Sequence, residues 1–190
     1  LVDVAGWFTV ATLSSPCAYT EISSRAEQAA TASGVSLSQY RRKLYVFPFI
    51  SSCGWSGLGT VGGNPSRAWI NGNLNLRVAG HELGHNFGLQ HSHSICAPGC
   101  SLDEYGDPWD IMGRSAGHFH AFQKEQLGWL DFNVSPPITK VTAAGTYRIG
   151  AYETNVNEPK ALKIFKGMNS SGERMNYFIE YRAGIGFDAS

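Results

Sequence analysis

The 190-residue sequence lacks an excess of either charge, because 15 Lys and Arg residues balance 15 Asp and Glu residues. That balance gives no sign of a strongly basic chain, so we expect neither nucleic acid nor an anionic membrane as a partner. No apolar run approaches the roughly 20 residues that cross a bilayer, so we expect no membrane span. The glycine-rich stretch 53–65 lacks the Gly-Lys-Ser/Thr of a phosphate-binding loop. What remains is a globular chain of one substantial domain, alone or with a small appendage.

Cysteine is scarce, and the four present are Cys17, Cys53, Cys96 and Cys100. An even count in a lightly charged, glycine-rich chain favours disulfides and an oxidising compartment, so we expect a secreted, extracellular protein. Of the three possible connectivities we favour Cys17–Cys53 with Cys96–Cys100. A second zinc site made of cysteines is the alternative, which the absence of paired CxxC spacings disfavours. The chain begins at Leu1 without an initiator Met, and we expect an N-terminal segment to have been lost.

The most informative stretch runs from His81 to His91, with the sequence HELGHNFGLQH. His81 and His85 are four apart, which places two imidazoles on one helical face at the separation that a tetrahedral zinc requires. Gly88 can adopt the left-handed backbone that ends a helix and returns the chain. His91 can then become a third ligand, while Glu82 lies beside the first one. The spacing therefore predicts a metal site.

Three neutral imidazoles leave one coordination position open for water, which indicates one catalytic Zn²⁺ ion. Such an ion lowers the pKa of its bound water towards ~7 and polarises a carbonyl. Glu82 would take the proton from this water and deliver it to the leaving amine. The pattern therefore predicts hydrolysis of a peptide bond without a covalent intermediate.

Around this site the hydrophobic pattern predicts alternating strands and helices in the first 133 residues. β-branched and aromatic runs predict strands over 4–13, 44–50 and 66–71, the second of them buried on both faces. Helices are expected over 20–32, over 76–87 with Asn73 or Asn75 as cap, and over 118–130. The strand–helix–strand order over 4–50 favours a crossover onto a mostly parallel sheet.

The character of the chain changes after Ser135-Pro136-Pro137. Segments 146–152, 161–165 and 176–182 have strand composition and predict a small antiparallel β appendage. Its edges would be bare unless it packs on the preceding unit or the natural chain continues past Ser190. We therefore expect an α+β protein with a catalytic domain over 1–133 and a β-rich C-terminal region over 134–190.

With these motifs in place, the sequence resembles the metzincin metalloproteases, whose signature is H-E-x-x-H-x-x-G-x-x-H. Met112, 21 positions after His91, is similar to the methionine of the family's Met-turn. Within metzincins the chain resembles the gametolysin family of secreted peptidases, on segments 53–59, 69–71, 81–91, 104–112, 124–129, 178–182 and 186–188. The resemblance implies a twisted mixed sheet, a zinc-binding helix, a Met-turn and a C-terminal helix.

The resemblance also implies an extended peptide or protein substrate that pairs with an edge strand before the zinc helix. The expected strand is Arg67 to Asn71, so Trp69, Ile70 and Asn71 are the candidate substrate-binding residues, although a strand Trp is equally a core residue. Residues 113–120 would form a pocket wall. Arg114 belongs to it, and occupies the position where some metzincins have a tyrosine ligand.

Several alternatives stay open at this point. Four acidic loop residues could hold Ca²⁺, although capping and turn roles suit the three Asp residues better: Asp103, Glu104, Asp107 and Asp110. His118 and His120 could belong to a second metal site, but we favour structural or pocket-wall roles for both. The leading function is a monomeric secreted zinc endopeptidase. The alternatives are a catalytically weak zinc-containing adhesion or wall-binding module and a zinc hydrolase of another type.

Overall fold

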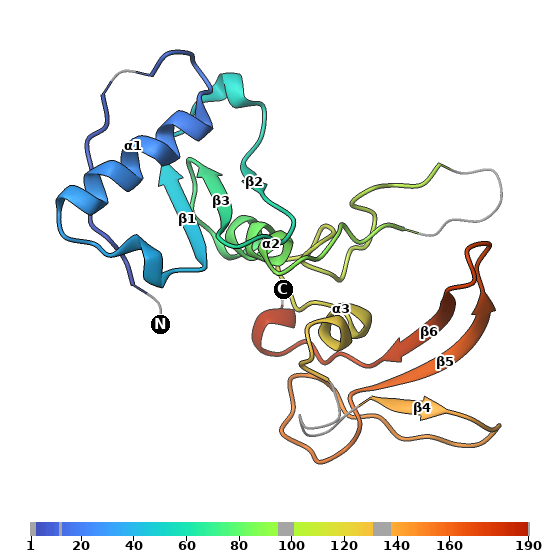
Figure 1. The fold of residues 1–190 in the computed structure, drawn as a ribbon. Helices are drawn as coiled ribbons and strands as arrows, with labels where there is room; N and C mark the ends of the chain where they lie inside the picture. The colour runs from blue at the N-terminus through green and yellow to red at the C-terminus, as the bar shows by residue number, and fades with distance from the viewer. Residues whose placement is uncertain (1–2, 12, 95–100, 131–137, 190) are drawn as a thin grey trace. The chain divides into compact units, whose positions relative to one another are not determined.

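The computed structural model describes residues 3–11, 13–94, 101–130 and 138–189. The chain forms two compact units, Leu1–Gln90 and His91–Ser190, which are described one at a time below. Figure 1 shows the elements of both. Compactness alone does not reveal which segments fold independently, so the division of the chain after residue 133 stays a prediction.

The first unit is built on a three-stranded mixed sheet in the order β1-β3-β2. Strand β1 (Arg42–Phe47) pairs in parallel with β3 (Ser66–Asn71), and the short β2 (Gly57–Gly59) pairs antiparallel with the other side of β3. A mostly parallel sheet was predicted from a crossover between segments 4–13 and 44–50, whereas the parallel partner of β1 is β3. The expectation that β3 is an edge strand is wrong, because β2 occupies that edge.

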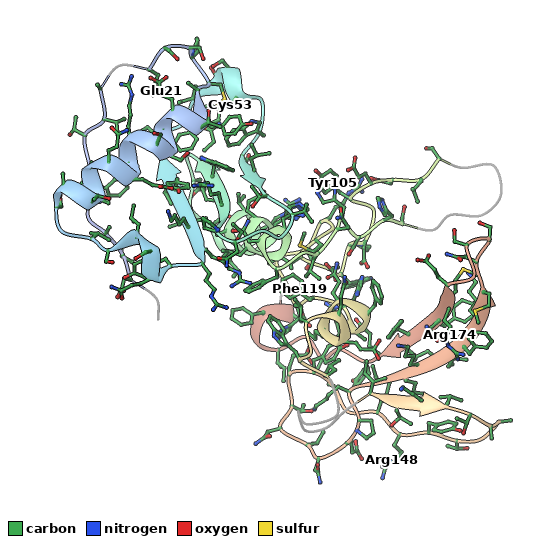
Figure 2. All side chains as sticks on the ribbon, viewed as in Figure 1. Glu21, Cys53, Tyr105, Phe119, Arg148 and Arg174 are labelled. Atoms are coloured by element: carbon green, nitrogen blue, oxygen red, sulfur yellow. A yellow bond between two sulfur atoms is a disulfide. The ribbon has the colours of Figure 1, made fainter. Side chains whose placement is uncertain are left out.

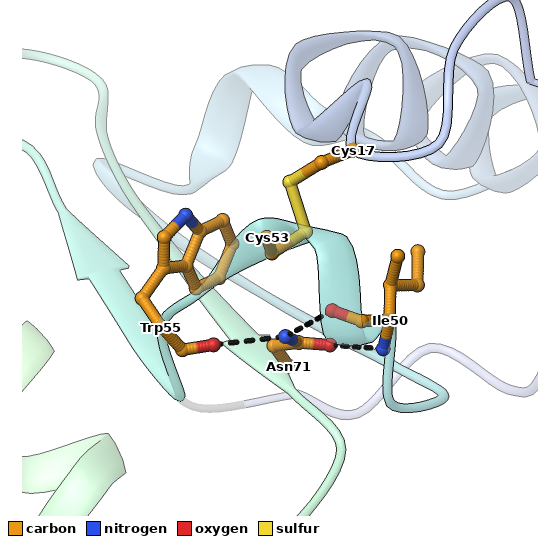
Figure 3. Close-up of a disulfide and its surroundings, with 5 residues drawn as sticks. All are labelled: Cys17, Ile50, Cys53, Trp55 and Asn71. Atoms are coloured by element: carbon orange, nitrogen blue, oxygen red, sulfur yellow. Dashed lines mark hydrogen bonds between the residues drawn. A yellow bond between two sulfur atoms is a disulfide. The ribbon is translucent and has the colours of Figure 1, made fainter.

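Helix α1 (Tyr19–Ala32) covers one face of this sheet (Figure 1). Its Ile22 packs in a cluster with Tyr45, Phe47 and Trp69, whose side chains lie on the face towards the helix. The disulfide Cys17–Cys53 confirms one predicted pair. It joins the start of α1 to the 3-10 turn η2 (Ser51–Cys53), as Figure 3 shows. The helix is therefore held to the sheet by apolar burial and by a covalent link.

Two strand expectations in this unit need correction. No strand occurs in the described part of 4–13, where Val4 and Trp7 are 94% and 90% exposed. The segment has the composition of a strand, but no other strand pairs with its described residues. Strand propensity without a pairing partner does not produce a strand. Strand β1 is also less buried than predicted, because Leu44 on its second face is 38% exposed.

Helix α2 (Leu76–Asn86) packs against β2 and β3 on the face opposite α1. Its N-terminus is capped by Asn75, whose side-chain oxygen accepts a hydrogen bond from Val78 N at 3.0 Å. Gly88 has φ +94° and ends the helix in the left-handed backbone that its sequence position predicted. A 3-10 turn η1 (Leu37–Gln39) connects α1 to β1.

The second unit contains helix α3 (Ala121–Gln126), strands β4 (Thr139–Val141), β5 (Ala161–Met168) and β6 (Arg174–Glu180), and the 3-10 turn η3 (Gly186–Asp188). Ala121, Leu130 and Ala161 form its buried apolar cluster. Both units combine helices with a small sheet, which confirms the predicted α+β class.

Among the helices of the described residues, none has the length and apolar character that a membrane span requires.

The sheet of the second unit is mixed rather than purely antiparallel, with the order β4-β5-β6. Strands β5 and β6 form the predicted antiparallel pair, whereas β4 pairs in parallel with β5. The third strand is therefore β4, and no strand forms over 146–152. The break at 135–137 and both Cys96 and Cys100 lie outside the described residues.

The disulfide joins two residues 36 positions apart, and the segment between them contains α1 and β1. Replacing both Cys17 and Cys53 by Ser should lower the free energy of unfolding by about 4 kcal/mol, because the unfolded chain regains the conformations that the link removes. Urea unfolding followed by tryptophan fluorescence measures this. The oxidised wild type is the reference, and an unchanged midpoint in the double variant would contradict the role given to the link.

Candidate functional site

The three predicted metal ligands lie together. Helix α2 presents His81 and His85 one turn apart, with their ring centroids 4.8 Å from each other. One ring nitrogen from each of these residues and one from His91 lie within 4.8 Å of one another. Small rotamer changes bring such nitrogens to a common metal ion. The residues present therefore suit a metal that takes imidazole ligands.

Hydrogen bonds fix which ring nitrogen two of these residues offer. Nδ1 of the buried His85 lies 2.9 Å from the carbonyl oxygen of Leu89, so it must carry the proton that it donates. Nδ1 of His91 lies 2.8 Å from a carboxylate oxygen of Glu104. Both arrangements leave Nε2 for a metal, and such outer partners orient ligand rings.

Glu104 is the site residue that the sequence reasoning missed. A calcium site was the only role that the sequence suggested for it, whereas its carboxylate contacts Nδ1 of His91. The neighbouring Tyr105, labelled in Figure 2, places its ring 4.1 Å from the His91 ring. The available signal was an acidic residue in the loop directly after the third histidine. Spacing alone could not show which of the four acidic residues turns back to the ring.

Glu82 projects from α2 towards strand β2 and is only 6% exposed. Burial raises the pKa of its carboxyl to about 7. The approach of helix to strand depends on glycine, because a Cβ at Gly57 would lie 2.4 Å from a carboxylate oxygen of Glu82. A Cβ at Gly59 would lie 2.8 Å from the carbonyl oxygen of the same residue. A buried carboxyl with a pKa near neutrality can both accept and return a proton.

The end of α2 is fastened to the sheet by polar contacts. The Asn86 amide donates to the carbonyl oxygens of Thr60 and Arg67 at 3.0 and 2.8 Å. Gly62 N donates to His85 O at 2.8 Å. These bonds hold the histidine-bearing turn of the helix against two segments of the same unit.

Met112 is fully buried in the second unit, within a tight turn. Its carbonyl oxygen accepts a hydrogen bond from Ser92 N at 3.0 Å, next to His91. The buried carboxylate of Asp110 accepts from Met112 N and from His120 N, each at 2.6 Å. One unexposed carboxylate thus shapes the turn and joins it to the segment before α3.

The residues predicted to bind substrate are buried in the sheet or engaged in contacts within the protein. Trp69, Ile70 and Asn71 are at most 5% exposed, and the Asn71 side chain bonds the backbone of Ile50 and Trp55 (Figure 3). Arg114, 58% exposed, forms an ion pair with Asp103. Their contact with substrate stays a prediction.

Two acidic loop residues serve turns, as their sequence position predicted. A carboxylate oxygen of Asp103 accepts from Tyr105 N at 3.2 Å, and one of Asp107 accepts from Trp109 N at 2.8 Å. Both bonds run to the second following residue, the pattern of an Asx turn. The calcium expectation gains no supporting contact from them.

A helix with two histidines four apart, a third histidine after a glycine turn and a buried glutamate between them is the arrangement of a metallopeptidase site. The sequence matches the family described as Gametolysin peptidase M11 over residues 3–188, so the chain belongs to this family of peptidases. No significant match was found among curated proteins or among solved structures. The resemblance to the gametolysin family is thereby confirmed.

The contact between β2 and α2 gives a testable consequence. Gly59→Ala should lower the free energy of unfolding by about 1–3 kcal/mol, because its Cβ meets backbone rather than a movable side-chain end. Urea unfolding measures the change. Gly6→Ala is the matched control, since no atom lies within 4 Å of its added Cβ. Equal stability of both variants would show that the strand and helix do not need glycine here.

Proposed function

We propose that this peptidase is a secreted zinc-dependent endopeptidase of the metzincin type. The observation that carries the proposal is the convergence of three imidazoles, two with Nδ1 already engaged, beside the buried Glu82. A set of three imidazole nitrogens suits zinc better than magnesium or calcium, which prefer oxygen. His81, His85 and His91 would hold the ion.

A zinc ion bound there would supply Lewis acidity, both to a water molecule and to the scissile carbonyl. The chain's own contribution is the movement of a proton. The Glu82 carboxylate would accept it from the attacking water and return it to the amine that leaves. Burial alone raises the pKa of this carboxyl to about 7, and a general base works best when its pKa lies near the operating pH. The turn at Met112 would hold its apolar side chain near His91, whose neighbour Ser92 donates to the Met112 carbonyl oxygen.

An extended substrate would pair with the outer edge of β2. In the described parts of the chain no strand pairs with that side of β2, and its glycines lie against Glu82. A peptide added there by backbone hydrogen bonds would pass beside the catalytic carboxylate. Trp69, Ile70 and Asn71 would then support the substrate strand from the central strand, and Arg114 would belong to the pocket wall.

The disulfide Cys17–Cys53 supports an oxidising location, in line with secretion. We propose that the enzyme acts as a monomer. The alternative function is a catalytically weak zinc-containing adhesion or wall-binding module. Such a module would need no proton acceptor beside the metal, so it would not account for the buried Glu82 carboxyl.

Glu82→Gln tests the proton-transfer role. The amide cannot accept the proton, so kcat on casein should fall by about 10²–10⁴-fold while zinc content stays unchanged. Proteolysis assays and metal analysis measure the two effects. Removal of zinc with a chelator should abolish cleavage by the wild type, and added zinc should restore it. Undiminished cleavage after complete removal, or none from the zinc-loaded protein, would refute the enzyme proposal.

Glu104→Gln tests the contact that orients His91. An amide cannot give the same charge-assisted hydrogen bond, so zinc affinity should weaken by about 10–100-fold. Competition with a chromophoric chelator measures the affinity. Glu158→Gln is the control, because this glutamate pairs with Arg148 at 3.9 Å and is not one of the site residues. Equal affinities in the two variants would remove Glu104 from the site.

A further inference from the structure

A second group of metal-ligating side chains lies wholly within the second unit. His118, Glu153 and Asp188 each offer one ligand atom, and these atoms lie within 4.8 Å of one another. The three residues come from segments far apart in the sequence: the stretch before α3, the connection that leads to β5, and the turn η3. None of them belongs to the histidine site described above.

The approach of these segments is close and specific. The Asp188 carboxylate accepts a hydrogen bond from His118 N at 2.9 Å. A Cβ at Gly117 would lie 2.2 Å from the same carboxylate oxygen, so only glycine allows the approach. On the other side, the Glu153 carboxylate accepts from Ala183 N at 2.9 Å. One oxygen of each acid is thus bound to backbone.

Apart from the neighbouring acid, the remaining oxygen of each carboxyl has no hydrogen-bond partner and is buried. These atoms are Oδ2 of Asp188, whose side chain is 9% exposed, and Oε1 of Glu153. Buried carboxylate oxygens without partners are costly, and two together also repel each other. A positive species between them, either a proton or a metal ion, removes both costs.

The nearby cations do not fill this role. Arg182 Nη1 lies 3.6 Å from Asp188 Oδ1, and its Nε pairs with Glu180 Oε1 at 2.7 Å. The Lys124 ammonium lies over the Tyr152 ring, 3.4 Å from its centroid. With Glu153, Glu180 and Asp188 opposing Arg182 and Lys124, one negative charge is left over when all five groups are ionised.

We propose that His118, Glu153 and Asp188 bind a second divalent metal ion, of the Zn²⁺ or Mn²⁺ class. The His118 imidazole favours a metal ion over a proton. Two carboxylates can share a proton without a third group, whereas a metal ion uses the imidazole nitrogen as a third ligand. A mixed set of one nitrogen and two carboxylates suits zinc or manganese better than calcium. The ion links the segment after Met112 to the C-terminal turn, and its role is structural.

Metal counting on the full chain tests the proposal independently of the peptidase site. After equilibration with a zinc buffer and gel filtration, the wild type should retain two zinc ions per chain. The His81→Ala/His85→Ala variant should retain one, and adding Glu153→Gln/Asp188→Asn should leave none. Glu158→Gln/Glu173→Gln is the matched control and should keep both ions.

The pattern of counts separates the two hypotheses. One zinc in the wild type and none in the His81→Ala/His85→Ala variant overturns the second site, and the two acids then share a proton. One zinc in both overturns the histidine site alone.

X-ray absorption of the zinc left in the His81→Ala/His85→Ala variant identifies its ligands without the acid substitutions. One imidazole with oxygen neighbours supports the proposal. Sulfur neighbours would assign the ion to Cys96 and Cys100, and two or more imidazoles to another histidine set. Either of those results overturns the proposal.

Discussion

The site depends on how closely helix α2 approaches strand β2. Gly57 and Gly59 lack the Cβ atoms that would meet Glu82, so the helix can lie directly on the strand and bury that carboxyl. The Asn86 amide secures the same contact through two backbone carbonyls. Because His81 and His85 share this helix with Glu82, the approach positions two of the three proposed ligands together with the proposed general base. The raised pKa of Glu82 is a direct consequence of that packing.

Much of the site could be predicted because its determinants are local. The helix, its Asn75 cap, the Gly88 turn and the spacing of the ligands all depend on residues within one short stretch. Glu104 could not be assigned to His91, because the two residues lie 13 positions apart and only the folded chain brings them together. Helix spacing predicts which side chains share a face. It does not predict which distant carboxylate orients a ring.

The fold shows the same limit at the level of strands. The segment 4–13 has strand composition but no neighbouring strand, and Trp7 stays 90% exposed. Strand β3 is not an edge strand, because β2 pairs with its outer side. Composition does not predict β2, since two of its three residues are glycines. Strand β4 was likewise missed in favour of 146–152. Pairing decides whether a segment becomes a strand, and pairing is a tertiary property.

The C-terminal residues that resemble the gametolysin family have a structural task within the second unit. Glu180 accepts from Ala121 N at 2.6 Å, at the start of α3. Arg182 donates to the carbonyl oxygens of Trp109 and His118, and Asp188 accepts from His118 N. All of these bonds hold the backbone on either side of Met112, the stretch that includes the expected pocket wall. Glu180 at the end of β6, Arg182 and Asp188 of turn η3 therefore shape the backbone on either side of Met112.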